Sequence, residues 1–251
     1  MTLHDYKYLA ILLTLLTATT AGLIPFYRRL RTLEGHGFPR SEALASGVFL
    51  GAALIHMLGN SAAQFNALGY TYPLAFLICG GVFLILLFVE HIATEILHHQ
   101  SKNMLSLVLL ATIMLSFHSF FAGSALGLTQ NFSTMLLILI AILAHKWAAS
   151  FALAVQINQN NTPIKIGLFL FLIFVLMTPL GILTGNALMP KLNHFGFLAP
   201  TISAIAAGTF LYIGTLHGLQ RSVMVKSCCN LRDFSFVIIG FTLMAIVAIW
   251  T

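Results

Sequence analysis

The chain has 251 residues, of which 59% are hydrophobic and only 7% are Asp, Glu, Lys or Arg. An ordinary soluble domain is about a quarter charged, so this composition argues against a soluble globular enzyme and against a disordered chain. It indicates a protein that crosses a membrane several times. The net charge of +6 is read as a sign of orientation rather than of a nucleic-acid partner. Three cysteines, two of them adjacent, imply no disulfide framework.

Eight apolar runs are each long enough to cross a hydrocarbon core of about 30 Å, which takes about 20 helical residues. They cover 6–27, 41–63, 73–97, 104–128, 133–156, 163–189, 199–222 and 233–251. The connections between them are short and contain Gly, Pro and Asn. The sequence therefore predicts one all-α membrane domain over residues 1–251. The first run lacks a convincing small-residue cleavage site, so we interpret it as a retained span and not as a signal peptide.

The basic residues are biased toward one side of the predicted bundle. Nine lie in or beside the connections that follow spans one, three, five and seven, whereas only Lys7 and Lys191 lie on the opposite side. Because cytoplasmic loops carry the excess of Lys and Arg, we predict that both termini lie outside. The short loops and the absence of a targeting segment are more typical of a cell (inner) membrane than of an organelle.

Five ionisable side chains stand out in the interior of the predicted spans, away from most span ends: His56, His118, His145, Lys146 and His217. A lone histidine in a span is often a hydrogen-bonded packing residue, but five ionisable residues on four helices are harder to explain in that way. Such residues usually face a cavity or a partner, and the facing helices of a bundle can bring imidazoles together around a metal ion. The pattern therefore predicts a metal site inside the membrane.

Two neighbouring spans carry small residues at every fourth position. These are Ser119, Gly123 and Gly127 in span four, and Ala144, Ala148 and Ala152 in span five. Small faces let membrane helices approach closely. The same turns carry His118 and His145, so we expect spans four and five to pack together and to bring the two imidazoles near each other.

Six motifs, taken in order, resemble the ZIP (Zrt/Irt-like) family of divalent metal transporters over nearly the whole chain. They are G-V-F-L-G-A-A-L-I-H at 47–56, Y-P-L-A-F at 72–76, H-S-F-F-A-G at 118–123, H-K-W-A-A-S-F at 145–151, T-P-L-G-I at 178–182 and A-G-T-F-L-Y at 207–212. The resemblance implies an eight-helix bundle with both termini outside. It also implies transport of zinc, or of iron or manganese, toward the cytoplasm along a path between spans two, four, five and seven. No enzymatic activity and no cofactor are expected, because the metal is the substrate.

The resemblance also assigns roles to particular residues. His118 and His145 are the implied central ligands, accompanied by Ser119, His56 and His217, and Lys146 is implied to fill a second cation position. A candidate exit site lies at the end of span three and comprises His91, Glu95, His98 and His99. The first three are spaced i, i+4, i+7 and share one helix face; the alternative is a polar helix end in the headgroup region. The expected partners are the metal ion and membrane lipid, with a homodimer as the candidate assembly.

The sequence departs from the family pattern at the carboxylates. Ala122 stands where a Glu usually follows the first histidine, Ala149 where some members carry a second Glu, and His217 where many carry a third. All six carboxylates of the chain lie near or outside span ends. The path therefore has no acidic side chain to offset the charge of an ion, whose transfer into low dielectric is costly.

Several functions remain open at this point. The chain could transport a divalent ion that favours nitrogen ligands, or it could bind its ion weakly in a wetter path. It could also be a degenerate homologue that senses or binds metal without transporting it. A zinc-dependent intramembrane hydrolase is the enzyme alternative, but no span interior offers the acidic base that such a site needs.

Overall fold

The computed structural model describes residues 3–31, 39–97, 104–160, 162–192, 196–216 and 231–250, and nearly all of them are helical. The elements are α1 (Leu3–Arg31), α2 (Pro39–Gly51), the π-helix η1 (Ala52–Met57), α3 (Leu58–Ala67), α4 (Leu74–Leu97), α5 (Met104–Gly127), α6 (Phe132–Gln159), α7 (Ile164–Leu192), α8 (Leu198–Tyr212) and α9 (Leu231–Ala248). Within the described residues, eight helical segments are long and apolar enough to cross a membrane. The prediction of an all-α protein with eight spans is confirmed.

The helices are longer than several of the predicted apolar runs. Helix α1 occupies Leu3–Arg31 although its apolar run covers only 6–27, because an apolar run marks the part of a helix that lies in hydrocarbon. Span two is one continuous helical stretch made of α2, η1 and α3. It ends at Ala67, and Gly69 in the turn that follows has a φ of +87°, a conformation that glycine adopts without strain and that commonly terminates helices.

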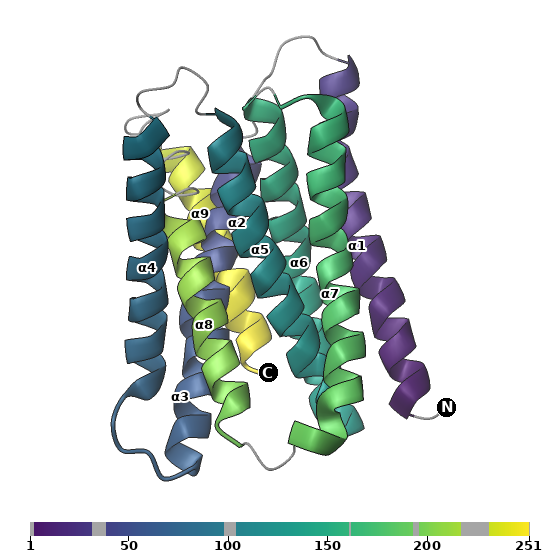
Figure 1. The fold of residues 1–251 in the computed structure, drawn as a ribbon, viewed down its shortest axis with the longest axis vertical. Helices are drawn as coiled ribbons and strands as arrows, with labels where there is room; N and C mark the ends of the chain where they lie inside the picture. The colour runs from purple at the N-terminus through teal and green to yellow at the C-terminus, as the bar shows by residue number, and fades with distance from the viewer. Residues whose placement is uncertain are drawn as a thin grey trace.

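The eight spans form two groups of four (Figure 1). Helices α1, α5, α6 and α7 pack mainly with one another, and α4, α8 and α9 pack with the continuous span α2–η1–α3. The groups meet chiefly where α5 contacts α8 and where α6 contacts α2. These are spans two, four, five and seven, the four that the resemblance implied would line a metal path.

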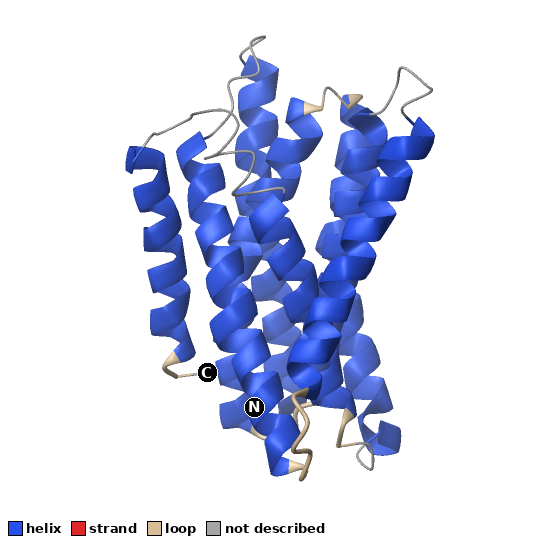
Figure 2. Ribbon diagram, turned by 90° about the vertical axis from the view of Figure 1, so that its left-hand side faces the viewer, coloured by secondary structure: helices blue, strands red, loops and turns tan. Residues whose placement is uncertain are grey.

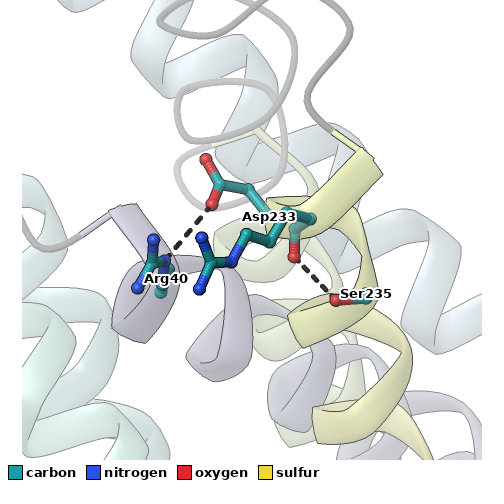
Figure 3. Close-up of polar contacts among 4 residues, drawn as sticks. Arg40, Asp233 and Ser235 are labelled. Atoms are coloured by element: carbon teal, nitrogen blue, oxygen red, sulfur yellow. Dashed lines mark hydrogen bonds and ion pairs between the residues drawn. The ribbon is translucent and has the colours of Figure 1, made fainter.

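Both chain termini lie toward the same end of the bundle (Figure 2), as an even number of spans requires. The opposite end is the one where α6 ends. The helices α2, α7 and α9 begin at this end, and their first turns carry Arg40, Lys165 and Arg232, respectively. An ion pair between Arg40 Nε and Asp233 Oδ1, 4.0 Å apart, joins α2 to α9 there (Figure 3).

Glycines allow the closest helix contacts within each group. A Cβ on Gly123 of α5 would lie 2.3 Å from the carbonyl oxygen of Thr178 on α7, and one on Gly181 of α7 would lie 2.1 Å from that of Phe120. The small face of span four therefore packs against span six. The expectation that it packs against span five is wrong for the two glycines, which contact α7, whereas Ser119 on the same face accepts a hydrogen bond from Lys146 of α6. The small face correctly indicated a close approach, but it did not identify the partner.

The outer surface of the bundle is strongly apolar. Large side chains such as Leu84, Phe88 and Phe169 are more than 60% exposed on α4 and α7. A patch of this kind would be a liability in water, but it is what a surface in contact with lipid requires.

Candidate metal site

Two buried histidines from different helices face each other at the contact between the two groups of spans. His118 of α5 and His145 of α6 are each 2% exposed, and their ring centroids are 5.6 Å apart with an angle of 70° between the planes. The expectation that these imidazoles lie close together is confirmed. Their role as metal ligands stays a prediction.

Helix α8, from the other group of spans, covers the histidine pair. The ring of Phe210 stacks on His118 with centroids 3.6 Å apart and meets His145 nearly edge-on at 5.1 Å. The hydroxyl oxygen of Thr209 lies 3.4 Å from His118 Nδ1. These contacts fix the orientation of both imidazoles.

A backbone carbonyl lies near each imidazole, that of Ala206 for His118 and that of Ala141 for His145, but each imidazole also presents a ring nitrogen without a well-formed hydrogen bond. Among the described residues, His118 Nε2 and His145 Nδ1 are buried without a hydrogen-bond partner. Buried polar atoms of this kind are uncommon and cost free energy. The lone pair of a neutral imidazole nitrogen is a good metal ligand, so the pair has the chemistry of an incomplete coordination sphere.

Lys146 lies next to the pair and is 2% exposed. Its Nζ donates hydrogen bonds to Ser119 Oγ on α5 at 3.0 Å and to Thr178 Oγ1 on α7 at 2.9 Å. The same nitrogen lies 4.0 Å from the centre of the Phe174 ring, within range of a cation–π contact. The ammonium thus joins three helices, and the hydroxyl oxygen of Ser119 is already an acceptor.

A narrow gap connects these side chains. It is lined by His118, Ser119, Ala122, Ile142, His145, Lys146, Ala149 and Thr178, and it is too narrow to admit a water molecule. Both alanines at the family's carboxylate positions face this gap, and none of its lining residues is acidic. The described residues contain no group of three or more His, Cys, Asp or Glu placed to hold a metal ion. An ion in the gap would therefore be held by two imidazoles, with hydroxyls or water to complete its coordination.

His56 lies on the π-helical turn η1 and is partly buried. Its Nδ1 is 3.4 Å from Asn60 Nδ2. π-helical turns often occur at functional sites. His56 does not join the pair in one cluster of potential ligands among the described residues, so its role as a ligand stays a prediction.

The other predicted site residues are only partly covered by the structure. His91 and Glu95 are exposed one turn apart on α4, whereas His98, His99 and His217 lie outside the described residues. Sequence reasoning missed Thr178 and Phe210. A signal was present for each: Thr178 is a polar residue before a proline in an apolar span, and Phe210 follows the small residues 206–208.

Known proteins resemble this chain along nearly its whole length. The family described as ZIP Zinc transporter matches residues 4–107 and 101–248. Zinc transporter ZIP2 of Mus musculus is 27% identical over 95% of this chain and 96% of its own length. Zinc transporter ZIP2 of Homo sapiens is 29% identical over 82% of this chain and 84% of its own length. Protein zntD of Dictyostelium discoideum is 34% identical over 62% of this chain, but that match spans only 23% of its own length.

The fold, the site and the family match agree with one another. Members of this family are transporters and not enzymes, and the metal is their substrate rather than a cofactor. The eight apolar helices are those of a multi-pass integral membrane protein. The chain therefore belongs to the ZIP zinc transporter family, whose members transport divalent metal ions.

Proposed function

We propose that this protein carries zinc, with iron or manganese as other cargos, toward the cytoplasm along the contact between its two groups of spans. His118 and His145 hold the ion midway. The observation that carries this proposal is the pair of buried ring nitrogens without a well-formed hydrogen bond, contributed by the neighbouring helices α5 and α6 where they meet α8 of the other group.

The donor set favours an ion that accepts nitrogen ligands. Imidazole suits zinc better than it suits hard cations, which prefer oxygen. With no carboxylate among the residues that line the gap, the charge of the ion is not offset locally. We therefore expect modest affinity at the pair, and a weakly held ion leaves readily, as transport requires.

Lys146 limits the site to one ion. Its ammonium, held by Ser119 and Thr178, fills the position where a second cation would otherwise sit. Ser119 then has two roles: it positions Lys146 and it offers a second lone pair to the ion. His56 and His217 are proposed as further ligands along the path, and the α4 face with His91 and Glu95 as a place where a departing ion is caught.

Passage of an ion requires a change in the contact between the groups. The gap beside the histidines admits no water molecule, and Phe210 of the opposite group stacks directly on His118. An ion can reach the ring nitrogens only when Phe210 and its helix shift relative to α5 and α6.

Zinc uptake into proteoliposomes tests this function. Vesicles that enclose a zinc-sensitive dye receive the wild type or the His118→Ala/His145→Ala variant. We expect uptake by the variant to fall close to that of empty vesicles, because both imidazoles are lost. His4→Ala is the matched control, since it removes an exposed imidazole at the start of α1, a helix that does not contribute to the histidine pair. Size-exclusion profiles and circular dichroism establish that each variant is folded.

Two results would contradict the proposal. Undiminished uptake of zinc, iron and manganese by the double variant would show that the pair is not on the path. Zinc binding without uptake by the wild-type protein would identify a homologue that binds metal without transporting it.

A further inference from the structure

We propose that Thr209 of α8 is a positioning residue for metal binding: it holds the hydrogen of the neutral His118 ring on Nδ1 and so leaves the lone pair of Nε2 for the ion. This inference rests on the proposed function, because it takes His118 to be a ligand. It identifies the atom of His118 that binds the ion, and it gives a helix of the other group of spans a part in preparing that atom.

The hydroxyl of Thr209 faces His118 as an acceptor and not as a donor. Thr209 is buried, and its Oγ1 donates to the carbonyl oxygen of Ala206, three residues earlier on α8, at 2.7 Å. A hydroxyl has one hydrogen and two lone pairs, so this bond uses the only hydrogen. Oγ1 also lies 3.4 Å from His118 Nδ1. Two lone pairs would repel each other there, so the contact is favourable only when Nδ1 carries the hydrogen.

The second nitrogen of the ring then has the opposite character. A neutral imidazole carries one N–H and one lone pair, so a hydrogen on Nδ1 leaves the lone pair on Nε2. Among the described residues, Nε2 is buried without a hydrogen-bond partner, so the nearby carbonyl of Ala206 accepts no hydrogen from it. An N–H at Nε2 would have no acceptor, whereas a lone pair at Nε2 can bind a metal ion. Both nitrogens therefore favour the same tautomer.

This arrangement prepares His118 for an ion. Histidines that bind metal commonly donate their other N–H to a protein oxygen, which fixes the tautomer and raises the basicity of the ligand nitrogen. The chain of contacts from His118 through Thr209 to Ala206 has this form. Because the gap beside the ring is too narrow for water, no water can move a proton from one ring nitrogen to the other. When Phe210 and α8 shift, His118 already has its lone pair on Nε2.

Nitrogen-15 NMR of histidine-labelled protein in detergent, recorded before and after addition of zinc, tests the tautomer directly. The protonated and unprotonated nitrogens of a neutral ring have well-separated shifts, and couplings to the carbon-bound ring hydrogens distinguish Nδ1 from Nε2. The signals of His118 are those that His118→Ala removes. Before zinc is added, we expect the hydrogen on Nδ1. After zinc is added, we expect the main change at Nε2.

Three variants separate this role from an effect on packing. Thr209→Val keeps the shape of the side chain but removes the acceptor, so we expect a mixture of tautomers and a zinc affinity roughly tenfold lower, as for other residues that orient a metal ligand. Thr209→Ser restores the hydroxyl and should restore both properties. Thr112→Val is the matched control, because Thr112 is also buried and also donates to a carbonyl of its own helix, that of Val108 at 2.7 Å. We expect it to behave as the wild type does.

Four outcomes would overturn the proposal. The wild type could carry its hydrogen on Nε2, zinc could bind through Nδ1 or not at all, Thr209→Val could bind zinc as tightly as the wild type, or Thr209→Ser could fail to rescue binding. Zinc uptake into vesicles, measured separately, distinguishes this proposal from the proposed function. Wild-type protein that binds zinc through Nε2 but takes up none would contradict transport and leave the role of Thr209 in place. Uptake by protein that binds zinc through Nδ1 would do the reverse.

Discussion

Replacing Gly123 with Ala should disrupt both the α5–α7 contact and the site that depends on it. The added Cβ would lie 2.3 Å from the carbonyl oxygen of Thr178 and 3.1 Å from the amide nitrogen of Ile182, whereas ordinary contact begins at 3.4 Å. Both atoms belong to the backbone, so no side-chain rotation can relieve the clash, and α7 must retreat by about 1 Å. Overpacking of this kind costs about 1–3 kcal/mol. The retreat also carries the Thr178 hydroxyl away from Lys146.

Thermal unfolding in detergent measures the first effect. For a chain of this size, a loss of 1–3 kcal/mol lowers Tm by roughly 2–12 °C. Gly80→Ala is the matched control, because a Cβ at that position of α4 would meet nothing within 4 Å. Since alanine is the better helix former, this control should unfold at the wild-type temperature or slightly above it. Equal Tm values for the two variants would refute the close contact between α5 and α7.

Three further substitutions test individual contacts. Ala122→Glu should tighten zinc binding roughly tenfold to a hundredfold, because Ala122 lines the gap and a carboxylate there adds a charged ligand; binding no tighter than that of Ala122→Gln would remove this position from the path. Lys146→Asp should raise the number of zinc ions bound per protein, and an unchanged ratio by elemental analysis would count against a second position filled by the ammonium. Lys7→Met should destabilise the protein by about 1.5–3 kcal/mol without changing zinc affinity, since the buried Lys7 Nζ donates to Gly127 O and Asn186 Oδ1. An unaltered Tm would contradict that prediction.

Hydropathy predicted the architecture because the bilayer imposes it. A span needs about 20 apolar residues, and the eight runs found in the sequence correspond to the eight described spans. Hydropathy did not predict the exact ends of the helices, because α1 and α6 continue beyond their apolar runs. The π-helical turn that carries His56 was not predicted either. It occurs in a stretch whose hydropathy is that of an ordinary apolar helix.

The sequence could not identify which helix packs against the small face of α5. Gly123 and Gly127 indicate that some helix comes close, but every apolar span is a candidate. The structure pairs them with α7. His118 and His145 nevertheless lie together, because α5 and α6 also touch, so the expectation about the imidazoles was correct although the glycines of the small face pack against α7.

The sequence predicted those residues of the candidate site that are unusual inside a membrane, and it missed those that are common there. Buried histidines and a lysine are conspicuous in a chain with so few charges. Phe210 and Thr178 are common residues in apolar spans, so only the structure shows that one stacks on His118 and the other accepts a hydrogen bond from Lys146. The hydrogen bond from Gln159 to Glu42 was missed because the two residues lie 117 positions apart in the sequence.

X-ray absorption spectroscopy at the zinc edge, on purified protein loaded with one equivalent of zinc, tests the central claim most directly. If His118 and His145 hold the ion, the spectrum should show imidazole nitrogen at about 2.0–2.1 Å, with outer-shell scattering from two rings, and this signature should disappear in His118→Ala/His145→Ala. A zinc environment without imidazole, or one that the double substitution leaves unchanged, would contradict the account.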